Sequence, residues 1–295
     1  MSEPIIAVVG AGAVGGLLAA LLDRAGVEVV VVARPQTARA ITTEGITIRS
    51  GHFGDGVSKI TALTEVPEGA NVILATKAYD LTDLTTVTGV TGALAQARPA
   101  EVVALLNGIE HLAVLRGQMP GALVAGASVA VESTRLSPTV IEHRSPFLRL
   151  TVPAHAAESG ITAAWRAAGL NVTVGGTDQE VLWAKLRFLA PMALLTSYWR
   201  LPIGAALERD TALTTALLLE VARIASLDGV PTDAGQLAGA LSALPPSMRS
   251  SLQNDLEAGH SSELDAIGGA LVRRGRTLGT DTSAVERLVA EITAR

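Results

Sequence analysis

Residues 4–22 read Pro4-Ile-Ile-Ala-Val-Val-Gly10-Ala-Gly12-Ala-Val-Gly15-Gly16-Leu-Leu-Ala-Ala-Leu-Leu22. An apolar run, the spacing G-x-G-x-x-G and a second apolar run predict a strand, a tight turn and a helix. Gly10 permits the turn, Gly12 lets backbone N–H groups approach a ligand, and Gly15 lets the helix pack closely on its strand. Because helix N-termini attract anions, we expect a dinucleotide pyrophosphate to contact Gly10, Ala11, Gly12, Ala13, Val14 and Gly15. The alternative is that Gly and Ala merely permit tight packing.

The composition narrows the class of protein. The 295 residues suffice for two domains with sizeable cores. A net charge of −5 and the lack of a Lys/Arg run argue against nucleic-acid binding. The absence of cysteine excludes disulfides, thiolate catalysis and cysteine-bound metals.

The apolar N-terminal stretch does not indicate a signal peptide or a membrane span. It lacks a basic start, contains four glycines, and is followed at once by Asp23 and Arg24. No other stretch offers the ~20 uninterrupted apolar residues that a spanning helix needs. The sequence therefore predicts a soluble, cytoplasmic protein without membrane contact.

Three further strands place polar residues where ligands of parallel sheets bind. The first spans residues 27–33 and ends in Ala33-Arg34, a cation that suits a 2′-phosphate and favours NADP(H) over NAD(H). The alternative for Arg34 is a solvated loop residue. The next two strands are followed by Lys77 and by Asn107-Gly108. Because ligands lie beyond the carboxyl ends of such strands, we expect Lys77 and Asn107 at one edge of the sheet.

The remaining chain divides into two parts. Residues 45–63 predict short strands, residues 122–133 and 140–152 are expected to complete the sheet, and a helix (160–168) and a short strand (171–174) follow. From residue 178 the pattern is helical only, with helices expected over 178–198, 203–227, 233–243, 251–257, 262–274 and 283–294. We predict an α/β Rossmann domain with a doubly wound, mostly parallel sheet (1–176) and an all-helical domain (177–295). The apolar stretch 213–227 offers a surface for a homodimer.

Two polar residues of the helical part are candidates for chemistry. Lys185 lies among apolar neighbours, where desolvation lowers the pKa of an amine and makes it a proton donor near neutrality. The alternative is a lysine that extends its amine to solvent. Gly259 can end one helix and Ser261 or Ser262 can cap the next. Glu263 would then lie in the first turn, ionised and suited to hold an ammonium group.

The order and spacing of these motifs resemble the ketopantoate reductase (2-dehydropantoate 2-reductase) family nearly end to end. The motifs that carry the resemblance are G-A-G-A-V-G-G (10–16), Arg34, T-K-A-Y-D (76–80), L-L-N-G (105–108), W-A-K-L (183–186) and S-S-L-Q-N-D-L-E-A-G-H-S-S-E-L-D (250–265). The resemblance implies NADPH-dependent reduction of a 2-oxo acid to a 2-hydroxy acid, as in pantothenate biosynthesis.

The resemblance also implies a role for each site residue. Lys185 would be the general acid, and Glu263 would orient it and touch the ribose on the nicotinamide side. Ser251 would bind the substrate carboxylate. Lys77 and Asn107 would line the pocket for the nicotinamide and the substrate.

The chain departs from the family at three positions that usually hold asparagine and here hold Leu189, Ala193 and Ile203. Residues 185, 189 and 193 share one helix face, and an apolar face cannot hydrogen-bond a substrate hydroxyl. Alternatives are therefore a more apolar 2-oxo acid, another carbonyl or an imine, or a non-catalytic NADP(H)-binding sensor. Pro191 is expected to kink the same helix.

Other polar residues give weaker signals. The histidines lack metal-ligand spacing, so we expect no metal site. His111 and Glu132 lie near strand ends and are secondary candidates for the active site. Ser251 has no adjacent base, which argues against a hydrolase.

Overall fold

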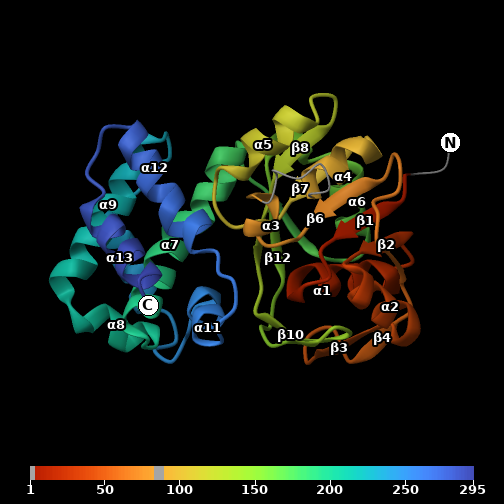
Figure 1. Cartoon of the computed structure of the whole chain (residues 1–295), viewed down its shortest axis with the longest axis horizontal. Helices are drawn as coiled ribbons and strands as arrows, with labels where there is room; N and C mark the ends of the chain where they lie inside the picture. The colour runs from red at the N-terminus through yellow and green to blue at the C-terminus, as the bar shows by residue number, and fades with distance from the viewer. Residues whose placement is uncertain (1–3, 83–89) are drawn as a thin grey trace. The chain divides into compact units, whose positions relative to one another are not determined.

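The computed structural model describes residues 4–82 and 90–295 and divides into two compact units (Figure 1). Unit 1 comprises Met1–Leu106 and His111–Val181, and unit 2 comprises Asn107–Glu110 and Leu182–Arg295. The short loop 107–110 thus packs with the C-terminal unit although the strand before it belongs to the N-terminal unit.

Unit 1 is built on a six-stranded parallel sheet in the order β5-β2-β1-β6-β7-β8. Its strands are β1 (Ile6–Val9), β2 (Val29–Val32), β5 (Thr61–Leu63), β6 (Asn71–Leu74), β7 (Glu101–Ala104) and β8 (Leu123–Gly126). Every residue of β1, β2 and β6 is buried, as expected for strands covered on both faces. The predicted Rossmann-type sheet is therefore confirmed.

Two smaller sheets complete unit 1. One has the order β10-β11-β3-β4, with β10 (Ser133–Ser137), β11 (Val140–His143), β3 (Ile46–Ser50) and β4 (Gly56–Ser58); the other has the order β13-β12-β9, with β13 (Asn171–Val174), β12 (Arg149–Val152) and β9 (Ser128–Ala130). The expectation that residues 122–133 and 140–152 complete the main sheet is wrong beyond β8. Strands such as β12 alternate buried and exposed residues, and a sheet covered on both faces does not suit that pattern.

Helix α1 (Ala13–Arg24) links the main sheet to the four-stranded sheet. It contacts β1 and β2 on one side and β3, β4, β10 and β11 on another. Leu17, Leu18 and Leu22 are fully buried, which explains why the helix is apolar on nearly all sides. The other helices of this unit are α2 (Pro35–Glu44), α3 (Tyr79–Thr82), α4 (Val90–Ala97), α5 (His111–Gln118), α6 (Gly160–Ala167) and the 3₁₀ turn η1 (Ala154–Ala156).

The C-terminal part is helical, as predicted (Figure 1). Its helices are α7 (Asp178–Trp199), α8 (Ile203–Arg209), α9 (Thr211–Leu227), α10 (Ala234–Ser242), α11 (Ser251–Glu257), α12 (Ala270–Thr277) and α13 (Ser283–Thr293), with a π-helical turn η2 (Asp265–Gly269) before α12. Helix α7 continues through Pro191. The helix expected over 203–227 is in fact two, because Asp210 leaves the helical conformation and accepts a hydrogen bond from the Leu213 N–H at 3.0 Å.

The apolar stretch 213–227 is used mainly inside unit 2. Leu217, Val221 and Ile224 of α9 are completely buried in the core of this unit. Only Leu219 and Leu227 are large exposed apolar residues of α9. The stretch therefore offers little of the dimer surface expected from its sequence, and a homodimer stays a prediction.

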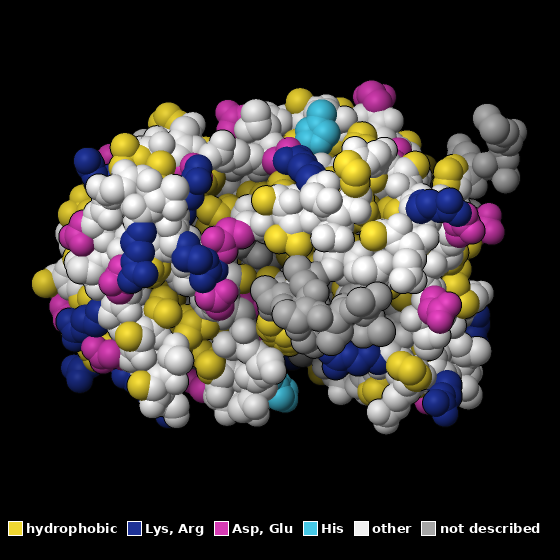
Figure 2. All heavy atoms as spheres, turned by 45° about the horizontal axis from the view of Figure 1, so that its top comes forward, with side chains coloured by type: hydrophobic (Ala, Val, Ile, Leu, Met, Phe, Trp, Pro, Cys, Tyr) yellow, Lys and Arg dark blue, Asp and Glu magenta, His cyan; other side chains and the backbone are white. Residues whose placement is uncertain are grey.

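The surface carries both kinds of charge. Figure 2 shows Lys and Arg side chains interspersed with Asp and Glu on the visible face. Within the described part of the chain, no helix has the length and apolarity required to cross a membrane.

Candidate active site

The turn after β1 can only be built with glycine at two positions. Gly10 has φ +105°, and a Cβ there would lie 2.7 Å from the carbonyl oxygen of Ala75. A Cβ on Gly15 would lie 2.1 Å from the carbonyl oxygen of Gly10. Both contacts are with backbone, which cannot move aside cheaply. These glycines are therefore required by the turn and by the approach of α1 to its strand.

Gly12 differs, because the space beside it is open. A Cβ on Gly12 would meet no atom within 4 Å. Gly12 is also the N-cap of α1, where no side chain caps the helix and no acidic residue lies in the first turn. The open space, the uncapped N-terminus and the helix dipole together fit the diphosphate of a dinucleotide.

Arg135 brings a positive charge to this turn and was not predicted from the sequence. Its Nη1 donates a hydrogen bond to the carbonyl oxygen of Ala11 at 3.2 Å. Arg135 lies on β10, 124 residues further along the chain. No local motif marks it, because its position depends on the packing of α1 against β10.

Arg34 follows β2, as the sequence predicted, and is the N-cap of α2. Its side chain is 84% exposed and pairs with Asp80, with 3.1 Å between Nη2 and Oδ1. Asp80 belongs to α3, which follows β6. The guanidinium group is thus accessible to a ligand at the end of β2 while an acidic partner holds it in place.

Lys77 and Asn107 follow neighbouring parallel strands. Lys77 comes three residues after β6 and is partly buried, and Asn107 comes three residues after β7. Asn107 begins the loop that packs in unit 2. Its side chain hydrogen-bonds Glu263, which also belongs to unit 2.

In unit 2, Asn107 contacts Glu263. The amide Nδ2 of Asn107 donates to Oε2 of Glu263 at 2.9 Å, although the two residues are 156 positions apart. Glu263 is only 6% exposed. The contact depends on Gly108, which has φ +90° and where a Cβ would lie 2.5 Å from the carbonyl oxygen of Ala266. The loop therefore fits closely against the helix that follows Glu263.

An ion-pair cluster holds the same loop. Arg273 on α12 pairs with Glu110 and with Asp265, each at 2.7 Å. The hydrogen bonds that Arg273 donates to Glu110 and Asp265 raise the pKa of Arg273 above its usual range. Each pair is solvent-exposed and weak by itself, but together they tie Glu110, at the end of the loop that carries Asn107, to Asp265, two residues after Glu263.

The sequence placed Glu263 in the first turn of a helix, but in the structure Glu263 lies just before that helix. The helical conformation begins at Leu264, and η2 follows directly. The carbonyl oxygen of Glu263 accepts the N–H of Ile267 at 3.0 Å. Glu263 thus stands at the helix N-terminus, where a carboxylate is stabilised by the dipole, and π-helical turns of this kind are frequent at functional sites.

Lys185 lies on α7, with its side chain partly buried. Burial lowers the pKa of its amine below the ordinary lysine value, and the negative charge of Glu263 opposes this effect. Because the effect of burial is the larger of the two, Lys185 gives up its proton more readily than a solvated lysine does. The two residues and Asn107 form a cluster suited to proton donation.

The face of α7 beside Lys185 is apolar. Ala193 is completely buried in the core of unit 2, and Leu189 packs against that core. Ile203, at the start of α8, is also buried. None of these side chains can hydrogen-bond a substrate hydroxyl.

The two adjacent serines of α11 have different roles. Ser250 is buried, accepts the N–H of Gln253 at 3.1 Å as the helix N-cap, and hydrogen-bonds the Thr196 hydroxyl at 2.7 Å. Ser251 is the first residue of the helix and is exposed. The exposed hydroxyl of Ser251 can therefore meet a ligand, whereas that of Ser250 is used within the fold.

The secondary candidates differ in burial. His111 is buried, and desolvation lowers its pKa to about 4, so its ring is neutral at physiological pH. Glu132 is exposed. Over residues 4–82 and 90–295, no group of three or more His, Asp or Glu side chains is placed to hold a metal ion.

Comparison with known proteins identifies the family. The model described as "Ketopantoate reductase PanE/ApbA" matches residues 6–156, and its C-terminal counterpart matches residues 179–295. The chain belongs to the ketopantoate reductase PanE/ApbA family of oxidoreductases. A relative, the 2-dehydropantoate 2-reductase of Caulobacter vibrioides, is 29% identical, and the match covers 98% of each chain.

Solved structures agree with this assignment. A PanE/ApbA family ketopantoate reductase from Ralstonia eutropha JMP134 has a TM-score of 0.86 and 29% identity, and the match covers 98% of this chain and 97% of that one. The ternary structure of D-mandelate dehydrogenase with NADH and anilino(oxo)acetate has a TM-score of 0.85, with the same coverage and 19% identity. The second likeness concerns the fold alone.

Proposed function

We propose that this family member reduces a 2-oxo acid to a 2-hydroxy acid with NADPH, in the manner of a 2-dehydropantoate 2-reductase. The observation that carries the proposal is the cluster of Lys185, Glu263 and Asn107 in unit 2. Its chemistry suits a proton donor for a carbonyl oxygen, and the family and its relatives support the reaction type.

In the proposed complex, both backbone groups and side chains bind NADPH. Residues 10–15 receive the diphosphate at the open space beside Gly12, and Arg135 adds positive charge there. Arg34 binds the 2′-phosphate, because an exposed guanidinium suits a phosphate dianion. Lys77, Asn107 and Glu263 are proposed to contact the nicotinamide half.

When bound, NADPH supplies the hydride that adds to C2 of the substrate. The carbonyl oxygen then gains negative charge and takes a proton from the Lys185 ammonium group, which gives the hydroxyl of the product. Glu263 orients that ammonium group and balances its charge. Asn107 fixes Glu263 by its hydrogen bond and contacts the substrate, and Ser251 binds the substrate carboxylate.

The apolar side chains beside Lys185 favour a second candidate substrate. Leu189 is partly exposed and can offer apolar contact, whereas Ala193 and Ile203 are buried, and none of the three offers a hydrogen bond. Such a surface favours a 2-oxo acid with an apolar side chain over 2-dehydropantoate, which carries a hydroxymethyl group. Another carbonyl or an imine of similar character fits the same surface.

The test is NADPH oxidation, followed optically, with a panel of 2-oxo acids that includes 2-dehydropantoate and analogues with apolar side chains. We expect turnover with at least one 2-oxo acid and a higher kcat/KM for apolar side chains. Tight NADPH binding without turnover on any of them would contradict the enzymatic proposal and leave a non-catalytic sensor.

A further inference from the structure

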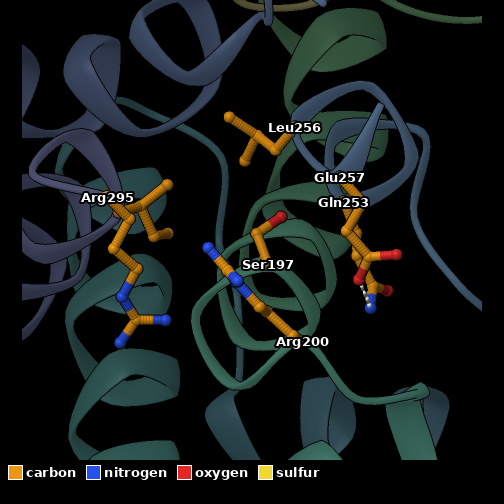
Figure 3. Close-up of a pocket in the computed structure, with 7 residues that line it drawn as sticks. Ser197, Arg200, Gln253, Leu256, Glu257 and Arg295 are labelled. Carbon is orange, nitrogen blue, oxygen red and sulfur yellow. Dashed lines mark hydrogen bonds between the residues drawn. The ribbon is translucent and has the colours of Figure 1, made fainter. Parts of the chain in front are cut away.

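A pocket of about 200 Å³ lies in unit 2 between α7, α11 and α13 (Figure 3). Its walls are formed by Ser197, Arg200, Gln253, Leu256, Glu257, Ile292 and Arg295. In Figure 3, Ser197 and Arg200 stand between Arg295 on one side and Gln253 with Glu257 on the other. None of these residues has a role in the reaction proposed above.

Two oxygen atoms of the wall are buried without a hydrogen-bond partner among the described residues: the hydroxyl of Ser197 and Oε1 of Gln253. Ser197 is 5% exposed and Gln253 is 1% exposed. The Gln253 amide cannot be turned around, because its Nε2 donates to Glu257 at 3.0 Å. A buried polar atom without a partner destabilises the fold, so both atoms point to a ligand that satisfies them.

Charges of opposite sign stand on opposite sides of the pocket. Arg295 donates to the carbonyl oxygen of Tyr198 and lies over the Tyr198 ring at 4.8 Å, so its guanidinium is held in place. Arg200 has φ +54°, a strained backbone conformation for a residue other than glycine. The carboxylate of Glu257 faces them; it accepts hydrogen bonds from Gln253 and from Arg249, which lower its pKa and keep it ionised.

We propose that this pocket binds a small α-amino acid with an apolar side chain. Arg200 and Arg295 suit its carboxylate, with the Ser197 hydroxyl as a further donor. The Gln253 carbonyl oxygen and Glu257 suit its ammonium group, and Leu256 and Ile292 contact its side chain. The volume limits the ligand to a small molecule.

The pocket is separate from the residues proposed for catalysis. Ser197 comes 12 residues after Lys185 on α7, a distance of roughly 18 Å along a helix. On α11, Gln253 and Leu256 line the pocket, whereas Ser251 does not. The ligand is therefore distinct from the 2-oxo acid substrate.

The direct test is calorimetric titration of the full-length protein with L-valine, isovalerate and isobutylamine. Isovalerate lacks the ammonium group of valine, and isobutylamine lacks the carboxylate. We expect valine to bind with a Kd on the order of 1 mM or tighter, as about eight non-hydrogen atoms allow. Each partial ligand should bind at least about tenfold more weakly, as loss of one charged contact predicts. No binding of valine, or equal binding of all three, would overturn the proposal.

Two variants test the residues themselves. Arg200→Asn removes the charge and keeps a residue that tolerates positive φ, and it should weaken valine binding about tenfold or more. Ser197→Ala removes one donor and should weaken it about threefold to tenfold. Arg49→Asn, at the exposed residue of β3 in unit 1, is the control and should bind valine as the wild type does. An unchanged Kd in both Arg200→Asn and Ser197→Ala would contradict the assignment; neither measurement needs turnover.

Discussion

The candidate site of unit 1 consists of backbone groups, whereas that of unit 2 consists of side chains. In unit 1 the turn at residues 10–15 is a backbone site, in which glycines leave space for a ligand and a helix N-terminus faces it. In unit 2 the site consists of side chains, with Lys185, Glu263 and Asn107 joined by charge and a hydrogen bond. A backbone site tolerates few substitutions, whereas neighbours of a side-chain site can change and alter the substrate. In this chain the neighbours of Lys185 on α7 include the apolar residues Leu189 and Ala193.

The largest expected effect is on the side-chain site. Lys185→Ala removes the proposed proton donor and should lower kcat by about 10²-fold or more, while the Kd for NADPH stays near the wild-type value. Lys59→Ala is the matched control, because Lys59 is an exposed lysine of unit 1 that donates to backbone carbonyls. Full turnover by the Lys185 variant would show that another group donates the proton.

The backbone site is tested by two glycines with different surroundings. Gly12→Ala places a methyl group in the open space and should raise the Kd for NADPH about tenfold, with stability unchanged within about 0.5 kcal/mol. Gly15→Ala forces its methyl against the Gly10 carbonyl and should reduce the free energy of unfolding by about 1–3 kcal/mol. Titration and denaturant unfolding measure the two effects. If Gly12→Ala binds NADPH normally, the diphosphate lies elsewhere.

Arg34 should distinguish the two nicotinamide cofactors. Arg34→Ala removes the proposed partner of the 2′-phosphate and should raise the Kd for NADPH about threefold to tenfold, a modest effect because the side chain is exposed. The Kd for NADH should not change. Arg39→Ala, on the same helix and exposed, should affect neither. Equal weakening of both cofactors would rule out selection by the 2′-phosphate.

The smallest expected effect is a change of pH dependence. Donation requires the charged form of Lys185, so activity should fall as pH rises through the pKa of Lys185, which burial lowers and Glu263 raises. Glu263→Gln removes the raising charge and should move this fall to lower pH. The measurement is the pH profile of kcat/KM, with exposed Glu208→Gln as the control. A profile that stays in place, or moves to higher pH, would separate Glu263 from Lys185.

Local signals made the N-terminal fold predictable. The glycine spacing of residues 10–15 and the buried strands β1, β2 and β6 follow from short patterns of residue type. Features that depend on distant contacts did not follow. The small sheets bring together strands that are far apart in sequence, and the break at Asp210 rests on a single capping side chain.

For the candidate site, too, local motifs indicated single residues but not the contacts between distant ones. Motifs and the family resemblance led to Lys185, Glu263 and Asn107 one by one, but the contact between Asn107 and Glu263 joins residues 156 positions apart. Arg135 was missed, since an arginine in a polar strand has no signature of its own. The roles of the site residues, and the domain limits 1–176 and 177–295, stay predictions.

The most direct measurement follows the hydride itself. NADPH carrying deuterium at the transferred position of C4 is incubated with the protein and an apolar 2-oxo acid, and the product is analysed by mass spectrometry. Our account predicts a 2-hydroxy acid with one deuterium at C2, formed by the wild type and at least about 10²-fold more slowly by Lys185→Ala. A product without deuterium, or no product from any 2-oxo acid under saturating NADPH, would contradict it.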